Sequence, residues 1–277
     1  MSNTQKRIIS AIVLVAIVAF CMVQGERAVS IFILVTSILF TDEFYTNILG
    51  YRRKSLPYLL NQALLVSCFI FFNFIESSYG YYQMFVNAGI VLNVFLFIFL
   101  FVKRSLSESL LQFARSMRVA PFLLIGLPSM AIAALLTHPF WERVITILLV
   151  INFGTDIGAW FCGKKFGKHK LWEAVSPNKT IEGAVGGAIV SSICALALWQ
   201  YFFLNVSLFH VLLFPFLSIT AQLGDLFQSK LKRIVNVKDS SQLIPGHGGV
   251  YDRIDSLIVV APFYAAFILS QAVPNTL

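Results

Sequence analysis

Residues 82–102 read YQMFVNAGIVLNVFLFIFLFV, a run of 21 residues without a charged side chain. A hydrocarbon core about 30 Å thick is crossed by an α-helix of about 20 mainly apolar residues. This run therefore predicts a transmembrane helix. Reading outward from it gives eight further runs of the same kind, so the predicted spans are residues 8–24, 28–48, 56–75, 82–102, 119–137, 142–162, 180–200, 204–226 and 255–273.

The composition supports a membrane protein. Hydrophobic residues make up 58% of the 277 residues and charged residues 12%, against about 45–50% and about 25% in soluble globular domains. So few charges could not cover a soluble surface of this size. We expect an all-α polytopic membrane protein with about nine transmembrane helices. Soluble, disordered, fibrous and disulfide-stapled secreted classes are excluded, and the four cysteines form no CxxC pair that would indicate a zinc site.

The basic residues divide unequally between the two sides of the predicted spans. Of the 21 lysines and arginines, 19 fall on one side, and only Arg27 and Arg143 fall on the other. Cytoplasmic loops of membrane proteins carry such an excess. The N-terminus is therefore predicted to be cytoplasmic and the C-terminus to lie outside. The same bias accounts for the net charge of +8 without a nucleic-acid partner.

The first half of the chain, residues 1–140, is predicted to be an N-terminal transmembrane scaffold. Asp42 and Glu43 form its adjacent acidic pair, near the cytoplasmic end of the second span. Charged side chains are tolerated near an interface far better than at the bilayer centre. We favour interfacial anchoring, or pairing with Arg52 or Arg53, over a role in a functional site.

Residues 141–277 are predicted to be a C-terminal transmembrane catalytic domain with cytoplasmic loops 163–179 and 227–254. Its carboxylates gather near one membrane face. A polar stripe on a membrane helix must face protein or a water-filled cavity, so these groups are candidates for a site. They are Asp156, one turn after Asn152; Asp225, on one helical face with Ser218, Gln222 and Ser229; and Asp252 with Asp255, three residues apart.

The start of the seventh span is predicted to bind an anion. Ser176 and Pro177 suit an N-cap and a first helical position. Free N–H groups at a helix start, together with Lys179, make a natural phosphate site. Farther along, a stripe of small residues predicts close packing on another helix; it comprises Gly183, Gly187, Ser191 and Ala195.

Residues 229–255, SKLKRIVNVKDSSQLIPGHGGVYDRID, are the most informative stretch. Their cations suit a polyphosphate, and their glycines let backbone approach a ligand closely. Carboxylates beside phosphates suit Mg²⁺. The stretch contains neither a Walker A loop nor GxGxxG. It predicts metal-assisted chemistry on a nucleoside triphosphate at the cytoplasmic surface. The cations are Lys232, Arg233, Lys238 and Arg253, and the glycines are Gly246, Gly248 and Gly249.

These residues closely resemble the signature of the integral-membrane CDP-diacylglycerol synthases, also called phosphatidate cytidylyltransferases. That signature runs S-x-[apolar]-K-R-x4-K-D-x-[GSA]-x2-[apolar]-[PG]-x-H-G-G-[apolar]-x-D-R-[apolar]-D, and every fixed position from Ser229 to Asp255 is satisfied. Residues 156–183, DIGAWFCGKKFGKHKLWEAVSPNKTIEG, resemble the family's second motif. They depart from it at Asn178, where a basic residue is expected. Residues 1–140 match only as apolar spans.

The resemblance implies the conversion of CTP and phosphatidic acid into CDP-diacylglycerol and pyrophosphate, in phospholipid biosynthesis. Asp225 and Asp252 would bind the metal, with Asp255 and Asp156 as second candidates. Catalytic roles fall to Lys232, Arg233, Lys238, His247 and Arg253, although His247 is also compatible with merely shaping the glycine-rich turn. Substrate binding falls to Ser176, Lys179, Thr180, Ser229, Gly248 and Gly249.

The resemblance also implies partners and a location. We expect Mg²⁺ as cofactor, with room for a second, monovalent ion. The protein would work in the inner (plasma) membrane as a multi-pass protein, with its active site on the cytoplasmic side, and a homodimer is compatible with this. Two alternatives remain open. One is a related CTP-using enzyme acting on another lipid phosphate. The other is an ion-coupled transporter, which should show inverted repeats and broken helices near the midplane.

Overall fold

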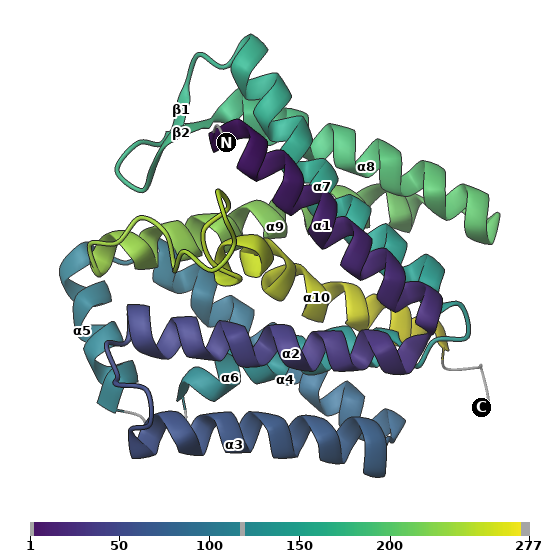
Figure 1. The fold of residues 1–277 in the computed structure, drawn as a ribbon. Helices are drawn as coiled ribbons and strands as arrows, with labels where there is room; N and C mark the ends of the chain where they lie inside the picture. Colours follow the sequence, from purple (N-terminus) through teal and green to yellow (C-terminus); the bar gives the residue numbers. More distant parts are fainter. Residues whose placement is uncertain (1–2, 117–119, 273–277) are drawn as a thin grey trace.

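The computed structural model of the protein describes residues 3–116 and 120–272, and most of them are helical (Figure 1). The first half holds α1 (Asn3–Gln24), α2 (Glu26–Glu43) with a π-helical turn η1 (Phe44–Ile48), α3 (Leu56–Ile70) with a second such turn η2 (Phe71–Ile75), α4 (Tyr79–Phe101), α5 (Arg104–Ser116) and α6 (Ala120–Leu135). The second half holds α7 (Trp141–Phe166), β1 (Lys170–Trp172), β2 (Ser176–Thr180), α8 (Ile181–Phe203), α9 (Leu208–Ile234) and α10 (Tyr251–Ala272).

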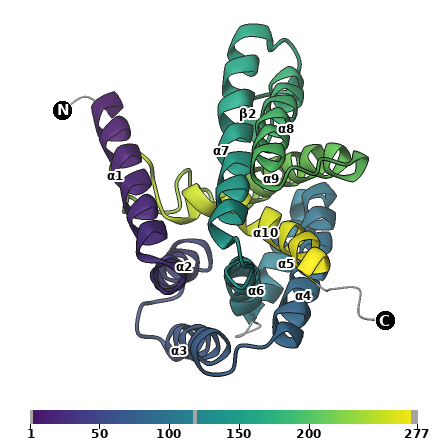
Figure 2. The ribbon, with the colours of Figure 1, turned by 90° about the vertical axis from the view of Figure 1, so that its right-hand side faces the viewer.

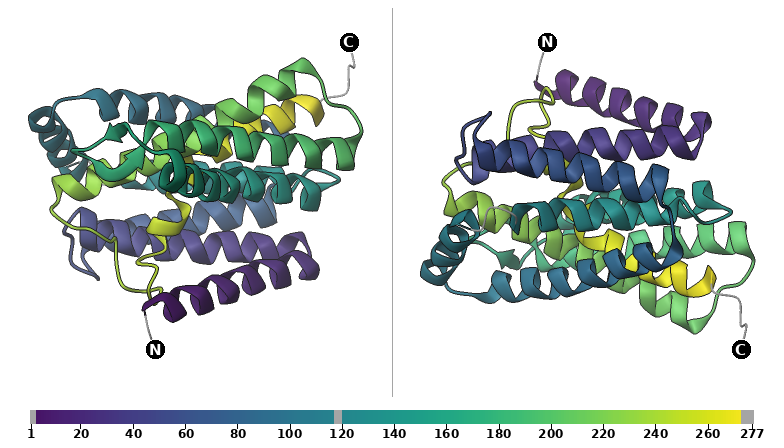
Figure 3. Two further views of the ribbon diagram at one scale, coloured as in Figure 1. Left: turned by 90° about the horizontal axis from the view of Figure 1, so that it is seen from above. Right: turned by 90° about the horizontal axis from the view of Figure 1, so that it is seen from below.

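The last helix, α10, runs through the middle of the molecule. It packs on α9, α6 and α4, and Figures 1 and 3 show it between the two halves. Val260, Ala261 and Tyr264 are fully buried there. By contrast, α1 packs mainly along α2 and stands apart from α7 (Figure 2). Its apolar side chains are therefore left for lipid.

The predicted close packing of the seventh span is confirmed. α8 lies so tightly on α7 that a Cβ added to Gly187 would come within 2.7 Å of the Thr155 carbonyl oxygen. A Cβ added to Gly183 would come within 2.8 Å of the Ala159 carbonyl oxygen. Small residues allow such approach between membrane helices. This contact fixes α7 and α8 as one rigid pair.

Eight of the nine predicted spans correspond to long helices, and the fifth corresponds to a shorter one. Within the described residues, eight helices are long and apolar enough to cross a membrane. The fifth predicted span, 119–137, is the shorter helix α6, which contains Pro128 and packs against α10, α4 and α2. Residue 119, like Arg118, residue 273 and Leu277, lies outside the described residues. A helix enclosed by other helices need not match the bilayer thickness.

Helix α5, which the apolar runs did not predict, connects α4 to α6. It has opposite apolar and polar faces, with Leu111 buried and Leu106 and Phe113 exposed. Arg104 and Glu108 form an exposed ion pair one turn apart. Such an amphipathic helix is typical of the membrane interface rather than of a span.

Both predicted cytoplasmic loops are shorter than expected. Loop 163–179 begins inside α7, and its second part forms the antiparallel hairpin β1–β2, the strands that an all-helical prediction left out. Loop 227–254 begins inside α9 and ends inside α10, which leaves 235–250 as the connection. The reason is that helices can project beyond the apolar run that crosses the lipid.

Candidate active site between α7, α8 and α9

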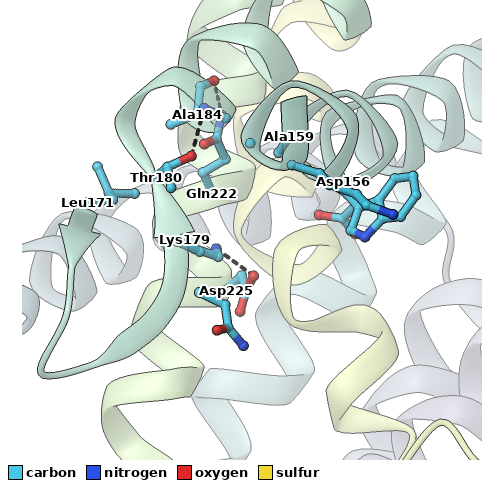
Figure 4. A pocket seen from close by; sticks show the side chains of 13 residues that line it. Asp156, Ala159, Leu171, Lys179, Thr180, Ala184, Gln222 and Asp225 are labelled. Atoms are coloured by element: carbon cyan, nitrogen blue, oxygen red, sulfur yellow. Dashed lines mark hydrogen bonds and ion pairs between the residues drawn. The ribbon is translucent and has the colours of Figure 1, made fainter. Parts of the chain in front are cut away.

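A cavity of about 470 Å³ opens between α7, the β1–β2 hairpin, α8 and α9 (Figure 4). Polar side chains from two helices and a strand converge on it. Its polar lining comprises Asp156 and Lys164 on α7, Asn178, Lys179 and Thr180 on or beside the end of β2, and Gln222 and Asp225 on α9. Of the site residues predicted from the sequence, the cavity therefore brings together Asp156, Lys179, Thr180 and Asp225.

The charges at this cavity are close but unevenly paired. The Nζ of Lys179 lies 2.5 Å from Oδ2 of Asp225, an ion pair drawn in Figure 4. Asp156, Asp225 and Asp255 lie near enough for their negative charges to interact. Three carboxylates against one directly paired lysine leave this region able to accept a cation or a cation-bound anion.

The hairpin brings Lys179 to the cavity, and it corrects the predicted start of α8. Ser176 and Pro177 lie in strand β2, so they neither cap nor begin the helix. Thr180 is the N-cap, and its side chain accepts from the N–H of Gly183 at 3.1 Å. Thr180 is also of a residue type that favours the N-cap position. Ser176 and Pro177, which were expected at the helix start, belong to the strand before it. Ser176 does not line the cavity.

The predicted polar face of α9 does face protein. Ser218 lies 2.7 Å from the hydroxyl of Thr155 on α7, and Gln222 donates to the Ala184 carbonyl on α8 at 3.0 Å. Ser229 donates to Oδ1 of Asp225 at 3.2 Å. These bonds hold α9 against the α7–α8 pair and orient Asp225 toward the cavity.

Residues 235–250, which we call the motif loop, fold back between α9 and α10. Ile244 and Gly248 pair through an isolated β-bridge. Gly246 and Gly248 adopt φ of 76° and 80°, which side-chain-bearing residues rarely do. Gly246 and Gly248 are thus required by the turn itself.

Asp252, the first residue of the motif's final acidic pair, has both oxygens occupied. Oδ1 accepts from Gln228 Nε2 at 2.9 Å and from Lys232 Nζ at 2.7 Å. Oδ2 accepts from the N–H groups of Ser240 at 2.8 Å and Gly249 at 2.9 Å, with the Ser240 hydroxyl at 3.0 Å. A carboxylate has about four lone-pair sites. Protein donors fill those of Asp252, so in this arrangement it binds the loop.

The remaining predicted cations lie around the loop rather than in the cavity lining. Lys232 is engaged by Asp252, whereas Arg233 and Lys238 are exposed. Arg253 is exposed and lies near enough to Asp156 and His247 to act on their charges.

His247 contacts the first helix. Its Nδ1 lies 2.6 Å from the hydroxyl of Ser10, and Arg7 Nε donates to the Gly246 carbonyl at 3.0 Å. Burial lowers the pKa of His247, and the nearby positive charges of Arg253 and Arg7 lower it further. These effects favour the neutral imidazole. This position favours the interpretation that His247 shapes the glycine-rich turn.

Sequence reasoning missed the part that the first half plays. The pairing of Asp42 with Arg53 was anticipated and is confirmed, at 2.9 and 2.7 Å. Glu43, however, points inward and accepts four hydrogen bonds from the motif loop and the start of α10. Its only signal was an acidic residue within an apolar stretch. Its partners lie about 200 residues away, beyond the reach of spacing arguments.

The carboxylates near the cavity do not form a complete metal site by themselves. No three Asp, Glu, His or Cys side chains among the described residues stand close enough together to hold an ion without help. Yet Mg²⁺ commonly uses one or two carboxylates and completes its shell with water and substrate phosphates. Asp225 and Asp156 at the cavity wall, with Asp255 close by, fit that donor chemistry, and a cation would relieve their mutual repulsion.

Comparison with known proteins adds to this geometry. Residues 5–271 match the sequence profile described as "Cytidylyltransferase family". A Bacillus subtilis (strain 168) protein named phosphatidate cytidylyltransferase is 47% identical over 115 residues, 41% of this chain and 43% of that protein. Proteins of the same name from Staphylococcus saprophyticus and Staphylococcus aureus (strain COL) are 49% and 46% identical over 119 residues, each covering 43% of this chain and 46% of the relative. The matches thus span less than half of each relative's length.

Proposed function

Since this chain belongs to the cytidylyltransferase family, we propose that it transfers the cytidylyl group of CTP to phosphatidic acid, forming CDP-diacylglycerol and pyrophosphate. The observation that carries the proposal is the cavity in which Asp156 and Asp225 meet Lys164 and Lys179 between helices long enough to span a membrane. The relatives named phosphatidate cytidylyltransferase support the choice of both substrates.

The reaction exchanges one phosphorus–oxygen bond for another. A phosphate oxygen of phosphatidic acid attacks the α-phosphorus of CTP, and the bond from that phosphorus to the bridging oxygen of pyrophosphate breaks. The attacking oxygen is already an anion, so no general base is needed. Catalysis of this kind is largely positioning and charge stabilisation.

The protein's own residues would supply that positioning. Lys179 and Lys164, at the cavity wall, are placed to bind phosphate oxygens, and an incoming triphosphate would compete with Asp225 for Lys179. Thr180 and Asn178 offer a hydroxyl and an amide at the same wall. Arg233, Lys238 and Arg253 surround the site as exposed cations that attract the anionic nucleotide and the lipid phosphate.

We further propose a Mg²⁺ ion held by Asp225 and Asp156, with Asp255 beside them. Bound there, the ion would neutralise negative charge on the phosphates. The mutual repulsion of these neighbouring carboxylates supports this assignment. Asp252, whose lone pairs are used by the motif loop, is left to position α10.

The distribution of basic residues supports the orientation that we propose for the protein in the membrane. We place the cavity on the cytoplasmic side of the plasma membrane, where CTP is available, and the lipid acceptor enters from the bilayer. A second copy of the chain is compatible with the exposed apolar helices and is not required by the chemistry.

Purified full-length protein in mixed micelles, supplied with CTP, phosphatidic acid and Mg²⁺, tests the proposal. We expect lipid-linked CMP and pyrophosphate in equal amounts. Parallel reactions with other lipid phosphates, such as a polyprenyl phosphate, distinguish the related CTP-using enzymes. Product only with another lipid phosphate would correct the acceptor, and no pyrophosphate with any acceptor would overturn the proposed reaction.

A further inference from the structure

Glu43 is a buried carboxylate at the end of α2, in the half of the chain that otherwise provides apolar packing. Only 3% of the residue is exposed. Within the described residues it forms no ion pair with lysine, arginine or histidine. A buried, unpaired charge is costly unless hydrogen bonds compensate it. The partners of Glu43 therefore indicate why the charge is there.

All four partners belong to the motif loop or to the first residues of α10. Oε1 accepts from the Ser241 hydroxyl at 2.6 Å and from the Val250 N–H at 2.9 Å. Oε2 accepts from the Ser240 hydroxyl and from the Tyr251 N–H, both at 2.9 Å. Val250 directly precedes α10 and Tyr251 begins it, and backbone N–H groups at a helix start lack helical acceptors. Glu43 thus caps α10 from another helix, with the charge sign that a helix start favours.

The position of the Glu43 carboxylate also explains what Gly249 and Ser240 do in the motif loop. A Cβ added to Gly249 would overlap a Glu43 carboxylate oxygen and the Ser240 hydroxyl, so glycine at this position is explained by the seat of the carboxylate. The Ser240 hydroxyl also lies 2.9 Å from Glu43 and 3.0 Å from Asp252. A hydroxyl carries one proton, so Ser240 lies between the two carboxylates as a donor that they share.

From these contacts we infer that Glu43 is a positioning residue for the cytidylyl transfer. It does not line the cavity. It fixes the motif loop and the first turn of α10, and through them Asp252, Arg253 and Asp255. The inference rests on the proposed function for its kinetic part and on the structure alone for its loop-ordering part.

The test compares Glu43→Gln with a matched control, Asp42→Asn. Each change removes one negative charge at nearly constant size. Asp42 bonds Arg53 and Tyr58 and has no bond to the loop. Glutamine in place of Glu43 has one acceptor oxygen and presents an NH₂ donor to other donors, so α10 loses part of its cap.

Two measurements follow. Glu43→Gln should lower kcat about 100-fold, the typical cost of misplacing reacting groups by about 1 Å, with a much smaller change in the KM for CTP. Hydrogen–deuterium exchange should quicken at Val250 and Tyr251 and through residues 239–250, while the hairpin of residues 170–180 exchanges as before. Asp42→Asn should match the parent protein in both measurements.

Each outcome of these measurements either supports or overturns the inference about Glu43. Parental kcat in Glu43→Gln, or faster exchange spread evenly over the chain, overturns the inference, the latter because it marks general loss of stability. If Glu43→Gln does not accumulate in the membrane, Ser241→Ala removes one donor and leaves the carboxylate. It should show the same two effects more weakly, and parental values would overturn the inference. A parent protein that is inactive with CTP refutes the proposed function, whereas the exchange measurement still judges Glu43.

Discussion

The carboxylates at the cavity and those at the motif loop differ in how many partners the protein gives them. Asp225 at the cavity has one lysine and one hydroxyl at 3.2 Å. Glu43 has four donors at 2.6 to 2.9 Å, and Asp252 has five at 2.7 to 3.0 Å. Carboxylates short of partners can take a cation or release a lysine to a ligand. Saturated ones fix the backbone around them.

The largest expected effect tests the cavity side of this comparison. Asp225→Asn should reduce turnover roughly 1,000-fold, because losing the charge removes about 4 kcal/mol of transition-state stabilisation through the ion. Insertion in the membrane and amide exchange in the motif loop should be unchanged. Activity is measured by release of pyrophosphate across a Mg²⁺ titration. Parental Mg²⁺ dependence in this variant would remove Asp225 from the metal site.

The next effect tests the loop side. Asp252→Asn should reduce turnover about 100-fold by mispositioning, and it should also quicken exchange in residues 239–250, because an amide NH₂ would face donors such as the Gly249 N–H. Combined with Asp225→Asn, the losses should multiply, as they do for independent roles. A double variant no worse than either single one would indicate that both carboxylates hold the same ion.

A smaller effect is expected from the lysine that bridges hairpin and cavity. Lys179→Ala should raise the KM for CTP roughly 10-fold, since one charge-assisted hydrogen bond to phosphate is worth about 1.5 kcal/mol or more. Lys170→Ala is the matched control, because its Nζ bonds the Pro177 carbonyl within the hairpin. Equal KM values for the two variants would argue against a phosphate role for Lys179.

The smallest effect concerns pH and the contact of the loop with α1. Burial and the charges of Arg253 and Arg7 lower the pKa of His247 from its ordinary 6.5. The unfolded chain thus takes up this proton at a higher pH than the folded protein, so the stability that His247 contributes is full above pH 6.5 and is lost as the pH falls. In the His247→Gln variant, the melting temperature should therefore change less with pH between about 5 and 8. An unchanged profile would exclude His247 as its source.

The sequence predicts the elements of this fold better than their junctions. Apolar runs locate the long helices because lipid demands a minimum length of apolar chain. They do not reveal α5, whose opposite apolar and polar faces are typical of the membrane interface. They also do not reveal the β1–β2 hairpin, which forms outside the apolar runs. Ser176 and Pro177 look like a helix start, yet Thr180, only four residues later, is an equally good cap and is the one used.

The candidate site likewise has one part that the sequence predicts and another that it does not. Asp156 and Asp225 could be predicted because polar residues in membrane helices need a protein or aqueous neighbour. The partners of Glu43 and Asp252 could not, because most of them are backbone N–H groups and serine hydroxyls, which carry no distinctive sequence pattern. The family resemblance also groups Asp225 with Asp252, whereas their surroundings separate them.

The cap on α10 has a consequence for the order in which the protein is made. Glu43 precedes Val250 by 207 residues, so at about 5–20 residues per second a ribosome delivers the donors roughly 10–40 s after the acceptor. During that interval α2 carries an acid whose permanent neighbours have not been synthesised. The start of α10 therefore completes the surroundings of Glu43 late in synthesis, and a chain arrested before it retains an unsatisfied buried charge.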